Sequence, residues 1–210
     1  GFTRTGSGTV ALISDGTKIA QFPTGQGTSG QALVTDGAGV LSFSDTGVTS
    51  DGANNTVAGT NAGDSITSGD HNTAVGKDAL TANTTGSQNT AVGSLALDAN
   101  ISGADNTCLG QFSLSGNTTG AENTATGQAA LAANTTGGKN TAVGNDALRN
   151  NTTASNNTAV GKSALLANTT GTSLVAVGYQ ALDANTTGND NHAFGWNALS
   201  SNTTGTNNVA

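Results

Sequence analysis

Residues 72–88 read N-T-A-V-G-K-D-A-L-T-A-N-T-T-G-S-Q, and the same pattern starts again with N-T-A-V-G at 89. Close copies of this five-residue start occur at 55, 72, 89, 106, 123, 140, 157, 174 and 191, always 17 residues apart. Nine complete units therefore run from 55 to 207 with the consensus N-T-A-V-G-x-x-A-L-x-x-N-T-T-G-x-x, and a tenth begins at 208. We number the positions of the unit from 1, its first Asn, to 17.

The constant length of the unit indicates an all-β fold built of stacked coils. One extra residue would disrupt a coil held in register with its neighbours, whereas a loop would tolerate the insertion. Helical repeats need about 33 residues and leucine-rich repeats about 20, so this unit is too short for either. We therefore expect a parallel β-solenoid or β-roll, in which nine coils at about 4.8 Å spacing make a rod of about 43 Å.

Five positions of the unit predict its backbone and its interior. Position 5 is Gly in all nine units, which predicts a positive φ or a close approach between backbones. Position 9 is Leu in eight units and position 4 is usually Val, so we expect both to line the interior. Positions 3 and 8 are nearly always Ala, and the tight space facing them lies either inside the coil or against another chain. The residues that represent these structural columns are Gly76, Gly93, Gly144, Gly161, Val75, Val143, Leu80 and Leu148.

Asn recurs at positions 1 and 12, as in Asn83 and Asn134 at position 12. Stacked amides in neighbouring coils form hydrogen-bonded ladders, so we expect two Asn ladders at the turns. The Thr pair that follows position 12, such as Thr84 and Thr85, suits a strand and is expected to stack in the same way.

Residues 1–54 lack the period but keep a β pattern, and we expect them to form an N-terminal cap or junction module before the repeats of 55–210. Expected strands are Thr9 to Ser14, Thr17 to Phe22, Ala32 to Thr35 and Val40 to Phe43. Asp15-Gly16 and Asp36-Gly37 are expected to be turns between them.

Composition argues against several classes of function. Charged residues make up 9% of the chain and its six Lys and Arg form no cluster, so we expect no nucleic-acid partner. No apolar run approaches the roughly 20 residues that cross a bilayer, so we expect no membrane insertion. His71 and His192 occupy different positions of the unit, and the acidic residues of position 10 are interrupted, so we expect no metal, no cofactor and no enzyme activity. Cys108, alone at position 3, is expected to be a small buried side chain without a redox role.

The N-T-A-V-G core resembles the Asn-Ser-Val-Ala-Ile-Gly repeats of trimeric autotransporter adhesin heads, which are shorter than 17 residues. The longer pattern with Ala-Leu and Asn-Thr-Thr-Gly looks like repeats of phage tail fibre proteins, and the resemblance covers about three quarters of the chain. Residues 27–43 look like a short β module that precedes such repeats. The resemblance implies an intertwined or side-by-side homotrimer, extracellular on a virion or cell surface. The small apolar content of each coil also argues, without the resemblance, for burial between chains.

We therefore expect a structural shaft or stalk, of a phage tail fibre or a surface adhesin, that holds a receptor-binding tip for host attachment. The receptor, a cell-surface carbohydrate or protein, would meet that tip outside this chain. Two alternatives stay open: a self-assembling extracellular filament, and a solenoid that binds a repetitive ligand such as a polysaccharide or ice. Tyr179 and Trp196, both at position 6, are either a small exposed aromatic patch for carbohydrate or a contact with a partner chain.

Overall fold

The computed structural model describes residues 2–5, 9–14, 17–21, 32–35, 41–44 and 54–210, with side chains described in 54–210 only. The chain divides into two compact units, Gly1–Gly52 and Ala53–Ala210.

The described residues of the first unit form two antiparallel sheets. One sheet has the order β1-β2-β3 and the other pairs β4 with β5. Their bounds are Phe2–Thr5 (β1), Thr9–Ser14 (β2), Thr17–Gln21 (β3), Ala32–Thr35 (β4) and Leu41–Ser44 (β5). The strands expected at β2 and β4 are confirmed with the same bounds and those at β3 and β5 in their described part, whereas β1 was not expected. The expected turns Asp15-Gly16 and Asp36-Gly37 lie outside the described residues.

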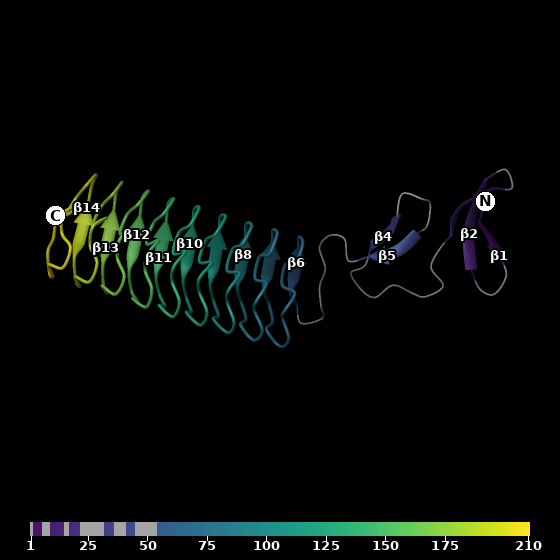
Figure 1. Cartoon of the computed structure of the whole chain (residues 1–210), viewed down its shortest axis with the longest axis horizontal. Helices are drawn as coiled ribbons and strands as arrows, with labels where there is room; N and C mark the ends of the chain where they lie inside the picture. Colours follow the sequence, from purple (N-terminus) through teal and green to yellow (C-terminus); the bar gives the residue numbers. More distant parts are fainter. Residues whose placement is uncertain (1, 6–8, 15–16, 22–31, 36–40, 45–53) are drawn as a thin grey trace. The chain divides into compact units, whose positions relative to one another are not determined.

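The second unit is a parallel β-solenoid in which each coil of 17 residues contributes one short strand (Figure 1). Within 54–210 the strands form one nine-stranded sheet in sequence order, and every pair is parallel with a register shift of one unit, as in Ala74 opposite Ala91. This confirms the all-β solenoid and its period. The strand bounds are Thr56–Ala58 (β6), Thr73–Val75 (β7), Thr90–Val92 (β8), Thr107–Leu109 (β9), Thr124–Thr126 (β10), Thr141–Val143 (β11), Thr158–Val160 (β12), Val175–Val177 (β13) and His192–Phe194 (β14).

Backbone hydrogen bonds join neighbouring coils well beyond these strands. The N–H of Leu80 donates to the carbonyl of Ala96 in the next coil at 3.0 Å, and the N–H of Gln88 donates to the carbonyl of Asp70 in the previous coil at 2.9 Å. Because bonds of this kind recur at the same positions of successive coils, an inserted residue would misalign all those that follow it. The constant unit length therefore has a direct cause in the backbone.

The interior of each coil is narrow. Leu80 and Leu148 at position 9 are fully buried, as expected, and so are the Ala residues at positions 3 and 8, such as Ala142 and Ala147. The Ala positions therefore face the inside of their own coil, which settles the alternative left open by the sequence.

The expectation that the Val residues of position 4 line the interior is wrong. Val75 and Val143 are 39% and 37% exposed, whereas Ala74 and Ala142, directly before them, are completely buried. Successive strand residues point to opposite faces, so when position 3 faces inward positions 2 and 4 must face outward. The interior holds Ala, and Val is on the outer face of the sheet.

The Leu residues of position 9 have a backbone conformation that their sequence does not suggest. Leu80 and Leu148 have φ of 56° and 51°, in the left-handed region that costs a side-chain-bearing residue about 1–2 kcal/mol. Residues at position 7 are left-handed as well, as with Asp78 at 56°. The Leu80 N–H bonds to the next coil and the Asp78 N–H to the previous one, so these conformations are accompanied by inter-coil bonds on both sides.

Candidate functional site

The Gly residues of position 5 form a corner that only Gly fits. Gly76, Gly93, Gly144 and Gly161 have φ between 133° and 139°. A Cβ on Gly144 would also lie 2.5 Å from the carbonyl oxygen of Gly161 in the next coil. Both reasons predicted for this column, the positive φ and the close approach, are therefore present at the same residues.

The Asn residues of position 12 form the first predicted ladder. Asn134 Nδ2 donates to Asn117 Oδ1 and to the carbonyl of Gly137, both at 2.9 Å, and Asn134 Oδ1 accepts from Asn151 Nδ2 at 2.8 Å. Asn83 likewise donates to the carbonyl of Gly86 at 2.9 Å and is fully buried. Buried amides with satisfied donors and acceptors stabilise the stack instead of destabilising it.

The Asn residues of position 1 form a second buried ladder, which also bonds the backbone. Asn140 N–H donates to Asn123 Oδ1 at 3.0 Å, and Asn140 Nδ2 donates to the carbonyl of Ala154 at 2.9 Å. Leu174 replaces Asn in one coil; its N–H still donates to Asn157 Oδ1 at 3.0 Å, but it has no side-chain oxygen to offer the coil that follows. The ladder is therefore interrupted at Leu174.

The Thr pair at positions 13 and 14 forms bends, not the strand that its composition suggested. Position 13 does stack between coils: Thr84 N–H donates to the carbonyl of Ile101 at 3.0 Å, and Thr84 Oγ1 donates to the same carbonyl at 3.1 Å. A side chain that doubles a backbone bond explains the preference for Thr here without a strand.

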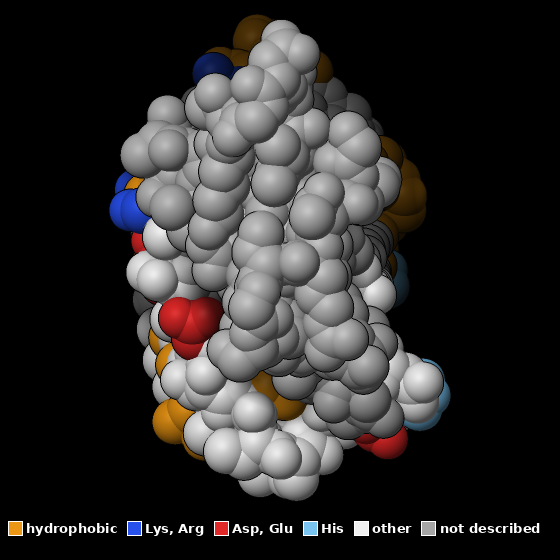
Figure 2. Space-filling model, turned by 90° about the vertical axis from the view of Figure 1, so that its right-hand side faces the viewer, with side chains coloured by type: hydrophobic (Ala, Val, Ile, Leu, Met, Phe, Trp, Pro, Cys, Tyr) orange, Lys and Arg blue, Asp and Glu red, His pale blue; other side chains and the backbone are white. Residues whose placement is uncertain are grey.

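Position 4 forms a single apolar line on the outer face of the nine-stranded sheet, which we call the outward row. It holds Ala58, Val75, Val92, Leu109, Thr126, Val143, Val160, Val177 and Phe194. Eight of these nine residues are apolar, and the Thr residues of position 2 run beside them. Figure 2 shows hydrophobic side chains reaching the described surface in several places, with a few acidic and basic side chains among them.

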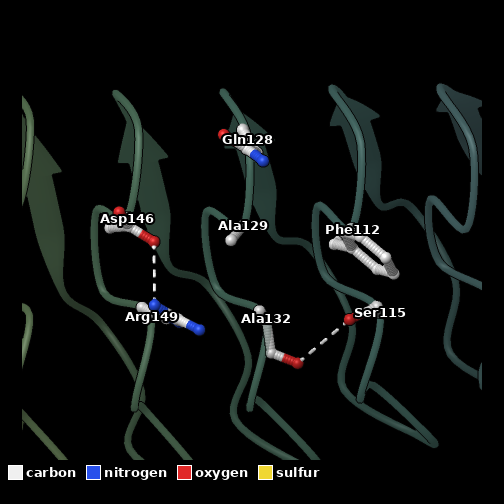
Figure 3. A pocket seen from close by; sticks show the side chains of 7 residues that line it. All are labelled: Phe112, Ser115, Gln128, Ala129, Ala132, Asp146 and Arg149. Atoms are coloured by element: carbon white, nitrogen blue, oxygen red, sulfur yellow. Dashed lines mark hydrogen bonds and ion pairs between the residues drawn. The ribbon is translucent and has the colours of Figure 1, made fainter.

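Positions 6, 7 and 10, which we call the variable arc, carry different residues in almost every coil. A hollow of about 520 Å³ opens on this arc over three successive coils (Figure 3). At positions 7 and 10 the middle coil contributes the small side chains of Ala129 and Ala132, while one neighbouring coil carries Phe112 and the other carries Asp146 and Arg149. The lining residues are Phe112, Ser115, Gln128, Ala129, Ala132, Asp146 and Arg149.

The polar groups of this hollow keep hydrogen-bonding capacity. Arg149 Nη1 lies 3.3 Å from Asp146 Oδ1, and the arginine side chain is 54% exposed. Figure 3 shows Arg149 extending from its coil towards Ala132, with Phe112 on the opposite side. The sequence did not single out these residues; the one signal it holds is that Ala occupies positions 7 and 10 of a single coil between two coils with larger residues.

Tyr179 and Trp196, the aromatic pair noted in the sequence, are 44% and 74% exposed and lie at position 6 of adjacent coils. They do not line the hollow. Phe194, also exposed, belongs to the same coil as Trp196. The carbohydrate contact suggested for the pair stays a prediction.

Several other titratable residues of the described repeats form isolated ion pairs, such as Lys77 Nζ with Asp78 Oδ2 at 3.1 Å. Among the described residues no three His, Cys, Asp or Glu side chains gather closely enough to hold a metal ion. Cys108 is fully buried, and burial raises the pKa of its thiol. Asp98 is half-buried with Oδ1 lacking a hydrogen-bond partner, and desolvation raises the pKa of that carboxyl. The described part of the chain has no helix that is long and apolar enough to span a membrane.

Comparisons with known proteins find no family model, no curated protein and no solved structure that matches this chain.

Proposed function

We propose that this chain is the structural shaft of an extracellular fibre, a tail fibre or surface adhesin, and that it works as a side-by-side homotrimer. The observation that carries the proposal is the outward row, an apolar line on the outer face of an uninterrupted sheet. The shaft holds a receptor-binding tip at a distance, so its useful properties are length and stiffness. The trimer number rests on the resemblance of the repeats to fibre and adhesin heads.

The outward row needs a partner on physical grounds. Nine strands at about 4.8 Å and a width of about 10 Å make a face of roughly 400 Å², the size at which exposed apolar patches mark interaction sites. The interior behind it holds one Leu and two Ala in a typical coil, which is a small core. Packing the outward rows of three chains around a common axis would remove Val75, Val143 and Val160 from water.

The stiffness of such a shaft follows from the ladders. Hydrogen bonds between coils at positions 1, 12 and 13 connect every coil to both neighbours, so bending the rod would break buried bonds. Mechanical strength then comes from repetition, because each added coil repeats the same interface.

The test is the solution mass of the full chain by light scattering coupled to size exclusion. We expect a stable mass of three chains, and we expect Val75→Glu, Val143→Glu and Val160→Glu in combination to shift it to one chain. The matched control places Glu on the same three coils at exposed position 14, as Thr85→Glu, Thr153→Glu and Thr170→Glu, and should leave the trimer intact. A monomeric wild-type chain would refute the trimer, and open-ended polymers would favour a filament subunit.

Ice binding is a second candidate, favoured by one observation. Position 2 is Thr in the first seven strands and position 4 is Val in five of the nine, and both positions lie on the outer face, so hydroxyl and methyl groups stand side by side in register on several neighbouring strands. Thermal hysteresis of the wild-type chain, measured beside its mass, separates the two: a monomer with hysteresis favours ice, and a trimer without it favours the shaft.

A further inference from the structure

We infer that the hollow on the variable arc is a binding site for one neutral pyranose ring of a surface polysaccharide. This inference goes beyond the proposed shaft and does not depend on it, because the hollow lies at positions 6, 7 and 10 and the outward row at position 4. A fibre with such a site would hold a glycan along its side as well as at a tip.

The size of the hollow suits a single sugar ring. Phe112 and Arg149 stand two coils apart, a separation of about 10 Å across the coil that holds Ala129 and Ala132. The volume of about 520 Å³ falls within the range of small-ligand sites. The hollow is shallow and open to solvent, so a ring that continues into a polysaccharide chain on both sides can enter it.

The lining matches the two kinds of surface that a pyranose presents. Phe112, 39% exposed, offers aromatic surface to the C–H groups of a sugar. Arg149 uses one nitrogen on Asp146, and its fork carries further N–H donors. Asp146 adds acceptors, and Gln128, whose Oε1 already accepts from Asn145 Nδ2 at 3.2 Å, adds amide donors, as a rim of hydroxyl groups requires.

The charge of the hollow favours a neutral ligand. Arg149 and Asp146 form an ion pair, so their charges cancel. An anionic sugar would meet the Asp146 carboxylate, and a wholly apolar ligand would desolvate the guanidinium without replacing its hydrogen bonds. A hydroxylated neutral ring satisfies both side chains.

The position of the hollow in the rod also supports the inference. Its three coils lie within 106–156, with solenoid coils on both sides, so its exposure is set by neighbouring coils in the structure.

The test is saturation-transfer NMR on the full chain with the methyl glycosides of glucose, galactose and mannose as probes. We expect transfer to the ring protons of at least one glycoside, with a dissociation constant on the order of 1 mM, as suits a ligand of this size. Filling the hollow with Ala129→Leu and Ala132→Leu should weaken binding at least tenfold. Both columns already accept Leu, as Leu95 at position 7 and Leu166 at position 10, so this variant should fold.

Two further variants, also taken from their own columns, test the lining. Phe112→Asn introduces the residue that Asn197 already places at position 7 of another coil, and Arg149→Ser introduces the residue that Ser115 places at position 10. Each variant should weaken binding at least tenfold. The matched control Phe194→Val removes an exposed aromatic residue elsewhere and should leave binding unchanged. The inference is overturned if none of the three glycosides receives saturation, if the filled hollow binds as the wild type does, or if Phe194→Val abolishes binding. The mass of each variant reports on the shaft separately.

Discussion

The inner face of the solenoid and the variable arc differ in how much sequence change they allow. Position 12 holds Asn in eight of nine coils and position 5 holds Gly in all nine, whereas position 10 holds six different residue types in those same coils. The inner residues bond or touch the same residue of the next coil, so a change in one coil disturbs its neighbours. Most residues of the variable arc are partly or fully exposed, so a change there disturbs fewer neighbours.

The comparison suggests a division of labour. The repeated positions build a rod whose shape does not depend on the arc, and the arc can then differ from coil to coil without loss of the fold. The hollow arises in this way, because two small residues in one coil and larger residues in its neighbours leave the backbone unchanged. Substitutions at the repeated positions should therefore cost more stability than substitutions on the variable arc.

The largest effect is expected from a charge placed inside a ladder. Asn134→Asp replaces the Nδ2 donor by a second acceptor that faces Asn117 Oδ1 and the carbonyl of Gly137, in a fully buried site. We expect a loss of about 4 kcal/mol in the free energy of unfolding at neutral pH. Burial raises the pKa of such a carboxyl, so the loss should shrink as pH falls through that raised pKa. Urea denaturation across pH, with half-exposed Asn202→Asp as the milder control, measures it; equal losses in the two variants would contradict the ladder's role.

A somewhat smaller effect is expected at the Gly corner. Gly144→Ala adds a Cβ at φ of 138° and 2.5 Å from the carbonyl oxygen of Gly161, so we expect a loss of about 3 kcal/mol. Gly195→Ala has a φ of 127° but no atom within 4 Å of the added Cβ, and should cost about 1 kcal/mol. Denaturation curves of the two variants separate the collision from the backbone strain. If both lose the same stability, the close approach between coils contributes nothing.

The same chemical change should have opposite signs at two buried Leu residues. Leu165→Asn places an amide in the Leu column and should cost about 3 kcal/mol. Leu174→Asn instead supplies the missing oxygen of the position 1 ladder to the N–H of Asn191, and should stabilise the chain by about 1 kcal/mol. Hydrogen exchange at Asn191 reports the restored bond; faster exchange in Leu174→Asn would show that the ladder gains nothing from the amide there.

The smallest effect is expected on the variable arc. Asp98→Ala removes a half-buried carboxylate whose Oδ1 lacks a partner, and Ala132 shows that position 10 accepts Ala. We expect Asp98→Ala to raise the free energy of unfolding by up to about 1 kcal/mol at neutral pH. The folded-state pKa of Asp98 is raised, so protonation stabilises the wild type: the gap should narrow as pH falls through that raised pKa and be closed below the ordinary value of 3.8. Thermal unfolding from pH 3 to 7 checks the sign, with Ser200→Ala as the pH-independent control.

Most of the solenoid could be predicted from its repeat, and the hollow could not. A fixed spacing with Gly at position 5 and Asn at positions 1 and 12 leaves few ways to stack, so the parallel coil, the Gly corner and both ladders follow from spacing and side-chain chemistry. The hollow depends instead on which side chains stand beside one another from three different coils. A repeat consensus removes such differences between coils, so it does not distinguish Phe112 and Arg149 from the other residues of their positions.

The sequence by itself determined the coil length, the register, the Leu interior and the hydrogen-bonding amides, because each of these repeats at a fixed interval and admits one physical explanation. Only the tertiary structure decided that both neighbours of the buried Ala face outward, that Val75 and Val143 are exposed, and that Leu80 is left-handed. The physical reason is that a three-residue strand has two faces of nearly equal polarity in this composition. Which of the two faces is buried depends on the path of the whole coil, which is held by hydrogen bonds to the neighbouring coils.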